Sequence, residues 1–391
     1  MSRWAPCAPS SRRIREVARI TGYLDYLIIG AVAALCTFGA TFAVRKLATR
    51  FAIIVLPDEQ RVHERPTPTV GGTAMFLGLL VAMAVASQMG GFQSVFRGSS
   101  EPIGLVLAAT VIFVVGMVDD LRDMSAPAKM AGQVLSGTIL YFFGISMLFF
   151  RVPFAGTTLV LSTGLAPILT VLWVVGMANA VNFVDGLDGL ATGIVGIAAI
   201  AFFLYSHKLL TLGIAAPGNS GSLVAIITLG VCIGFLPHNF HPAKIFMGDA
   251  GAMLLGLLMA SSTMSVVGQT DNTYSGRTYF FFAPIVIPFF ILGIPMLDTA
   301  FAVIRRAARL SNPAERDLNH LHNRLMRLGH GQTRAVLILW TWTALLSGLV
   351  LYPALTNHNL SFVPIGVGVL GVALYTLFRP RGRTGAASAG P

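Results

Sequence analysis

Charged residues are scarce in this chain of 391 residues. Asp, Glu, Lys and Arg together make up only 11% of the sequence, less than half of the roughly 25% that is typical of soluble domains. Hydrophobic residues make up 55%, and the mean hydropathy is +0.75. A water-soluble globular fold is therefore excluded, and the composition predicts an all-α polytopic membrane protein.

Cysteine is scarcer still, because the chain holds only Cys7, Cys36 and Cys232. Three scattered cysteines are too few for a disulfide framework or a zinc site. The net charge of +11 would suit a nucleic-acid-binding protein, but the basic residues lie between apolar runs and not along one face. We therefore expect anionic membrane lipids as partners and no nucleic acid.

Eleven apolar stretches approach the ~20 residues that a helix needs to cross the hydrocarbon core. Because unpaired backbone groups are costly in lipid, such runs are expected to be helices. We predict about eleven transmembrane helices in one domain over residues 23–378, after a basic, disordered extension (1–22) and before a cytoplasmic tail (379–391). The stretches are 24–44, 70–89, 103–118, 130–150, 158–178, 189–206, 222–236, 248–268, 279–303, 334–352 and 361–378.

Lys and Arg are distributed unevenly between the two sides of these stretches. The loops after odd-numbered stretches and the tail hold 18 of them, whereas the opposite loops hold 4. Since basic loops stay in the cytoplasm, we expect a multi-pass protein of the cell membrane with odd-numbered loops and the C-terminus in the cytoplasm. The arginines of the first 22 residues disagree with this orientation, and the later loops outweigh them.

A pair of acids ends the third apolar stretch on the expected cytoplasmic side. Asp119 and Asp120 are adjacent, and Lys129 follows them. Neighbouring carboxylates at a membrane interface repel each other and lose solvation, so a metal ion, a cation or a proton transfer is expected to offset that cost. A solvated helix cap would also explain an isolated acid pair.

A second polar segment, residues 179–190, combines amides and acids with glycines. Spacings of three place the polar groups on neighbouring helical faces, and the glycines permit a bend. Such a turn suits the base and ribose of a nucleotide, although Asp-Gly is also a common turn signal. Its acids and amides are Asn179, Asn182, Asp185 and Asp188.

Asp249 opens the eighth apolar stretch, shortly after Phe246. A carboxylate suits the positive end of a helix, so N-capping is the plain explanation. Mg²⁺ binds one or two carboxylates together with substrate phosphate oxygens. Asp249 is therefore a candidate ligand if Asp119 and Asp120 lie opposite it.

Two further loops carry candidate anion-binding residues. His320 and His322 do not share a helix face and do not have zinc-site spacing, so we expect them to act with the planar guanidinium of Arg324 on phosphate or sugar oxygens. An amphipathic surface helix with solvated charges is the alternative. Arg65 precedes the Gly71-Gly72 helix start, a kind of terminus that binds phosphate.

Together these segments resemble the polyprenyl-phosphate N-acetylhexosamine-1-phosphate transferases, the superfamily that includes the phospho-N-acetylmuramoyl-pentapeptide transferases. Matching segments run in order from about residue 23 to residue 334. The sequence His-Leu-His-Asn-Arg-Leu at 320–325 looks like the His-x-His-His-Arg pattern of the N-acetylglucosamine-1-phosphate branch, which contains the WecA and TagO enzymes. Asn323 departs from that pattern.

The resemblance implies transfer of N-acetylglucosamine 1-phosphate from UDP-N-acetylglucosamine to undecaprenyl or decaprenyl phosphate, with release of UMP. This is the first lipid-linked step in the synthesis of cell-envelope polysaccharides such as lipopolysaccharide, arabinogalactan or teichoic acid. The implied cofactor is Mg²⁺, with Mn²⁺ as a substitute. The implied partners are the two substrates, membrane lipids and a second copy in a homodimer.

The resemblance also implies roles for individual residues. Asp119 would act as the base towards the lipid phosphate, although a covalent phosphoryl-aspartate route stays open. Asp249 would bind the metal, with Asp119 or Asp120 as a further contact. The full set is Asp119, Asp120 and Asp249 as catalytic residues, Asn182, Asp185, Asp188 and Phe246 as nucleotide-binding residues, and Lys129, Arg65, His320, His322 and Arg324 as phosphate- or sugar-binding residues.

Two alternatives compete with this interpretation. A phospho-N-acetylmuramoyl-pentapeptide transferase would use the same acids with a different histidine cluster. A proton-coupled transporter would place its acids near the bilayer midplane in inverted repeats of broken helices. The acids here gather at one interface and no such repeat is visible, so we expect an enzyme.

Overall fold

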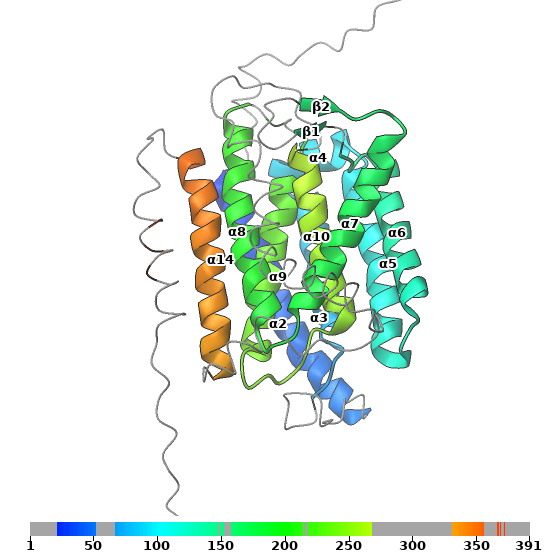
Figure 1. The fold of residues 1–391 in the computed structure, drawn as a ribbon, viewed down its shortest axis with the longest axis vertical. Helices are drawn as coiled ribbons and strands as arrows, with labels where there is room; N and C mark the ends of the chain where they lie inside the picture. Colours follow the sequence, from blue (N-terminus) through cyan, green and yellow to red (C-terminus); the bar gives the residue numbers. More distant parts are fainter. Residues whose placement is uncertain are drawn as a thin grey trace, which may run out of the picture.

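The computed structural model describes residues 22–51, 67–147, 149–151, 158–213, 215, 218–267 and 331–355, with 366, 368 and 371. In this part of the chain, long helices run side by side in a bundle (Figure 1). One small antiparallel sheet of β1 (Phe149–Arg151) and β2 (Thr158–Val160) lies at one end. The expected helical class of a multi-pass membrane protein is confirmed.

The described helices follow most of the predicted apolar stretches. Six are long and apolar enough to cross a membrane, and α3 with the segment after it would be a seventh, bent by 91°. The predicted stretch 279–303 and most of 361–378 lie outside the described residues, so the count of eleven stays a prediction. The elements are α2 (Tyr23–Arg50), α3 (Gly72–Gln88), η1 (Gly90–Phe92), α4 (Gln93–Gly98), α5 (Glu101–Arg122), α6 (Ala126–Phe142), α7 (Leu165–Val184), α8 (Leu190–Thr211), α9 (Gly221–Asn239), α10 (Gly248–Val267) and α14 (Gln332–Leu355).

The prediction was wrong about where the fourth stretch ends. It was expected to run to residue 150, but α6 ends at Phe142 and Gly144 follows with a φ of +95°. That left-handed conformation costs glycine little and most other residues much. The apolar Phe149 and Phe150 that extended the predicted stretch belong to strand β1 instead.

The fifth stretch was likewise expected to begin at residue 158, which is the first residue of β2. Thr158 and Val160 are β-branched and favour a strand. Helix α7 begins after Gly164 and continues to Val184, beyond the predicted end at 178. An apolar run shows only which part of a helix lies in hydrocarbon. The helix itself can continue into the interface, where water solvates its polar side chains.

Helix α10 occupies the centre of the bundle and is almost wholly buried. It packs against α3, α5, α7, α8 and α9, whereas α14 packs on the outside of α8 (Figure 1). Helix α2 exposes most of its surface, including Leu35 and Phe42, as expected for a helix that faces lipid. The first turn of α10, which carries Asp249, is therefore held by neighbours on several sides.

Two glycines let the chain approach the first turn of α10 closely. A Cβ atom on Gly116 of α5 would collide with the backbone of Ala250. Gly248 has a φ of +67°, and a Cβ there would collide with the carboxylate of Asp120. The end of α5 and the start of α10 can therefore touch through their backbones.

Candidate active site

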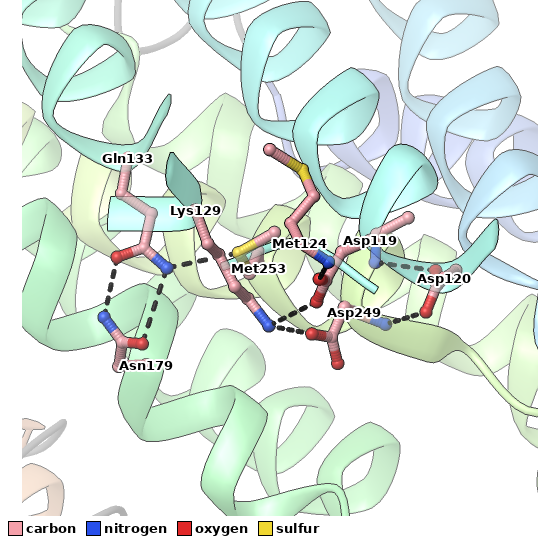
Figure 2. Close-up of polar contacts among 9 residues, drawn as sticks. Asp119, Asp120, Met124, Lys129, Gln133, Asn179, Asp249 and Met253 are labelled. Atoms are coloured by element: carbon pink, nitrogen blue, oxygen red, sulfur yellow. Dashed lines mark hydrogen bonds and ion pairs between the residues drawn. The ribbon is translucent and has the colours of Figure 1, made fainter. Parts of the chain in front are cut away.

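The predicted acids gather at one end of the bundle, where α5 and α7 end and α6, α8 and α10 begin. Figure 2 shows the centre of this cluster, with side chains from α5, α6 and α10 pointing toward one another. Helix α3 begins beside it, because Gly71 and Gly72 donate backbone hydrogen bonds to Phe246 and Met247 at 3.0 and 2.9 Å. Segments far apart in the sequence thus build one site.

Lys129 lies between two carboxylates. Its Nζ is 2.9 Å from Oδ2 of Asp119 and also contacts Oδ2 of Asp249 (Figure 2). The Lys129 and Asp119 side chains are largely buried, with 16% and 14% of their surface exposed. Partial burial strengthens this charge pairing relative to an exposed pair. Three helices therefore direct charged groups to one point. We call Asp119, Lys129 and Asp249 the charged cluster.

Asn182 of α7 joins the same cluster. With its amide oriented to satisfy both neighbours, it donates to Oδ1 of Asp249 at 3.0 Å and accepts from Nζ of Lys129 at 3.1 Å. Sequence analysis assigned Asn182 to the nucleotide pocket. The structure places it against the lysine and the acid of the charged cluster.

The adjacent acids Asp119 and Asp120 face different partners. Asp119 accepts from Nζ of Lys129 and, through Oδ1, from the backbone N–H of Met124 at 2.6 Å. Asp120 accepts from the backbone N–H groups of Asp249 and Ala250 at 2.7 and 3.1 Å. A carboxylate in this position satisfies the free N–H groups of a helix start and suits its dipole. Asp120 therefore caps α10 and holds Asp249 in place.

Asp188 holds the loop between α9 and α10. It is buried, and its Oδ2 accepts from the backbone N–H of Ala243 at 3.0 Å and lies 2.8 Å from Nδ1 of His241. The predicted turn after α7 does form, with Gly189 at a φ of +75°. Asp188 thus ties this turn to the segment that leads to Phe246 and Asp249.

Asn239 makes a second connection between the same two segments. Its Oδ1 accepts from the backbone N–H of Gly189 at 3.1 Å and from Oγ1 of Thr192 at 2.9 Å, and its Nδ2 donates to the carbonyl of Ile245 at 3.1 Å. Sequence analysis gave Asn239 and His241 no role. The run His-Asn-Phe-His at 238–241, which ends an apolar helix with polar side chains, was the signal that could have found them.

Asp185 lies at the end of α7, near two other acids. Burial, together with the charges of Asp120 and Asp188, raises the pKa of this carboxyl to about 7 from its ordinary value of 3.8. The acids of this end of the bundle therefore crowd one another. A bound cation would relieve that repulsion.

The remaining predicted residues divide into two groups. Phe246 is partly exposed beside the cluster, and its backbone N–H donates to Pro68 at 2.8 Å. Arg65, His320, His322 and Arg324 lie outside the described residues. The structure thus brings together Asp119, Asp120, Lys129, Asn182, Asp185, Asp188, Phe246 and Asp249.

The charged cluster fits the Mg²⁺ that the family resemblance implies. The carboxylates of Asp119 and Asp249 both point to the Lys129 ammonium. The two acids are therefore arranged around a positive charge. Among the described residues no group of three or more His, Cys, Asp or Glu side chains is placed to hold a metal. Since Mg²⁺ needs only one or two carboxylates when substrate phosphates and water complete its shell, these acids fit a metal that binds together with a diphosphate.

Comparison with known proteins identifies similar chains. The model of glycosyl transferase family 4 matches residues 102–267. A decaprenyl-phosphate N-acetylglucosaminephosphotransferase of Mycolicibacterium smegmatis is 35% identical over 90% of this chain and 88% of its own length. A Bacillus subtilis protein named a probable undecaprenyl-phosphate N-acetylglucosaminyl 1-phosphate transferase is 36% identical over 83% and 80%. A phospho-N-acetylmuramoyl-pentapeptide-transferase of Staphylococcus aureus is 29% identical over 75% and 86%.

Proposed function

Because this chain belongs to glycosyl transferase family 4, among the polyprenyl-phosphate N-acetylglucosaminephosphotransferases, we propose that it transfers N-acetylglucosamine 1-phosphate from UDP-N-acetylglucosamine to a polyprenyl phosphate. An oxygen of the lipid phosphate attacks the β-phosphorus of the donor. The bond from that phosphorus to the bridging oxygen breaks, and UMP leaves. The observation that supports this most strongly is the contact of Lys129 with both Asp119 and Asp249.

Phosphoryl transfer depends mainly on positioning and on neutralising charge. Asp249 would hold Mg²⁺, and the ion would supply positive charge that neutralises the phosphate oxygens. Lys129 exchanges its carboxylate partners for a phosphate oxygen of the substrate, because its flexible ammonium can follow the negative charge. Asn182 orients the Asp249 carboxylate through its amide N–H.

Asp119 is suited to accept the proton of the lipid phosphate. The hydrogen bonds from Lys129 and the Met124 N–H hold its two oxygens in place within the cluster, and a positioned carboxylate can act as a general base. Asp120 acts on the reaction through Asp249, because both of its oxygens accept N–H groups of α10.

The nucleotide is proposed to bind over the turn after α7 and against the Phe246 ring. Asp188 and Asn239 support this pocket by fixing the loop that carries Phe246. We further propose that this end of the bundle faces the cytoplasm. It holds the connections from α5 to α6, α7 to α8 and α9 to α10, which follow odd-numbered apolar stretches, and in the sequence such loops with the tail hold 18 Lys and Arg residues against 4 in the opposite loops.

The identity of the donor distinguishes this proposal from the alternative, a phospho-N-acetylmuramoyl-pentapeptide transferase. Identity of 35–36% to the N-acetylglucosamine enzymes against 29% to the muramoyl-pentapeptide enzyme favours the simple hexosamine. The test mixes the purified protein with Mg²⁺, decaprenyl phosphate and a panel of UDP-sugars and measures UMP. We expect UMP from UDP-N-acetylglucosamine alone and none in excess EDTA. Preference for a UDP-muramoyl-pentapeptide would contradict the donor, and release in EDTA would contradict the metal.

A further inference from the structure

A second polar contact lies one helical turn further into the bundle than the charged cluster. Gln133 of α6 and Asn179 of α7 face each other (Figure 2). The Asn179 Nδ2 donates to Oε1 of Gln133 at 2.7 Å, and the Gln133 Nε2 donates to Oδ1 of Asn179 at 3.4 Å. The Gln133 side chain is buried, with 1% exposed. A reciprocal amide pair therefore connects two helices inside the bundle.

The amide donors of this pair are all engaged within the protein. Each amide has two N–H donors. Asn179 uses its second on the carbonyl of Val175 at 2.8 Å, and Gln133 uses its second on Sδ of Met253 at 3.2 Å. Because no N–H group is left to donate to a substrate, the pair is suited to hold the helices and not to contact the reacting phosphates.

Gln133, Asn179 and the Met253 that Gln133 contacts lie one turn below the charged cluster, one on each of α6, α7 and α10. Residues three or four apart on a helix share one face. Gln133 follows Lys129 by four on α6, and Asn179 precedes Asn182 by three on α7. Met253 correspondingly follows Asp249 by four on α10. Lys129, Asn182 and Asp249 thus each have a neighbour from their own helix among Gln133, Asn179 and Met253.

We propose that Gln133 and Asn179 are positioning residues that set the register of α6, α7 and α10, so that Lys129, Asn182 and Asp249 meet at one point. The proposal rests on the proposed function. Apolar packing in lipid tolerates sliding of one helix along another, whereas directional hydrogen bonds between helices do not. Displacement of a reacting group by 1 Å can cost about 10²-fold in rate. Loss of the hydrogen bonds between Gln133 and Asn179 should therefore reduce turnover.

The test compares Gln133→Leu, Asn179→Leu and the double variant in the UMP-release assay, with UMP affinity measured in parallel. We expect each single variant to lose about 10- to 100-fold in kcat, as is typical when groups that support a metal site are removed. UMP affinity should stay within about twofold, because Asp188 and Asn239 hold the turn after α7 and the Phe246 loop together independently of this pair. The double variant should be no slower than the worse single variant, since residues of one network are not additive.

Two further variants separate register from plain destabilisation. Exchanging the amides, Gln133→Asn with Asn179→Gln, keeps the combined length and should restore at least part of the lost kcat. Ser136→Ala is the matched control, because Ser136 is buried on α6 and, in the part of the chain that the structure describes, its Oγ bonds only within that helix, to the carbonyl of Gly132 at 2.9 Å. It should keep wild-type turnover.

The outcomes distinguish this proposal from the proposed function. If the wild-type protein releases no UMP from any UDP-sugar, the proposed function fails and this proposal with it. If the wild type is active and both leucine variants keep its kcat, the positioning role alone is wrong. Equal losses in kcat and UMP affinity, or equal slowing by Ser136→Ala, would assign the pair a structural role and also overturn the proposal.

Discussion

Asp120 accepts a 2.7 Å hydrogen bond from the backbone N–H of Asp249, a residue 129 positions further along the chain. The bond joins the end of α5 to the start of α10, and Gly116 and Gly248 let the two backbones come close enough for it to form. Through this contact one member of the acid pair positions the residue proposed to bind the metal. The other member, Asp119, points to Lys129.

Asp120→Asn should lower both stability and turnover. The new NH₂ group cannot accept an N–H bond, so α10 loses part of its cap, and loss of a cap typically costs about 0.5–2 kcal/mol. We expect a lower melting temperature in detergent and slower UMP release at every Mg²⁺ concentration. A fully stable variant with wild-type turnover would show that the cap does not position Asp249.

Asp119→Asn should leave the fold intact and remove the proposed base. A positioned base contributes about 10²–10⁴ in rate, so kcat should fall by that order while UMP still binds. Asp123→Asn is the matched control, because Asp123 is exposed just beyond the same helix and Asn tolerates its φ of +47°. Lost UMP binding at unchanged turnover would assign Asp119 to the nucleotide pocket instead.

Asp249→Asn should weaken metal use while the protein still folds. The neutral amide is a poorer Mg²⁺ ligand than a carboxylate, and it would also lose the Lys129 ion pair. We expect most of the turnover to disappear and the Mg²⁺ concentration for half-maximal activity to rise. Titration of UMP release with MgCl₂ measures both. Near-normal activity with the usual Mg²⁺ dependence would exclude Asp249 as the ligand.

Asp185→Asn should change how stability depends on pH. The folded-state pKa of Asp185 is raised to about 7 from 3.8, so between these values the folded chain holds a proton that the unfolded chain releases. The stability from that proton is present at low pH and is lost as pH rises through about 7. The variant has no such group, so its melting temperature relative to wild type should rise from pH 5 to pH 8 in ligand-free protein. A difference that is constant with pH would contradict the raised pKa.

Sequence patterns predicted the helices well, because long apolar runs in lipid have one stable form. They failed at residues 142–165, where the apolar Phe149 and the β-branched Thr158 belong to strands at the end of the bundle. Hydropathy does not distinguish a short apolar strand from a helix end. Gly144 and Gly164 were the local signals that marked these limits.

The acid motifs were recognisable from the sequence, but their partners were not. Lys129, Asn182 and Asp249 come from three helices, and their meeting depends on close backbone packing that no local pattern encodes. The sequence also could not separate Asp119 from Asp120, because adjacent residues on a helix point in different directions toward partners set by the tertiary fold. Gln133 and Asn179 carried a usable signal, since Gln133 is a polar residue within an apolar run, Asn179 directly follows one, and each has helical spacing from a site residue.

The fate of the donor's β-phosphorus shows directly whether the enzyme transfers the sugar together with its phosphate. Wild-type protein is incubated with Mg²⁺, decaprenyl phosphate and UDP-N-acetylglucosamine that carries ³²P only at the β-phosphorus. We expect the label to move to the lipid with the sugar and the released nucleotide to be unlabelled UMP. Release of labelled UDP, with sugar on the lipid but no ³²P, would mean transfer of the sugar alone, and would contradict phosphoryl transfer at the Asp119, Lys129 and Asp249 site.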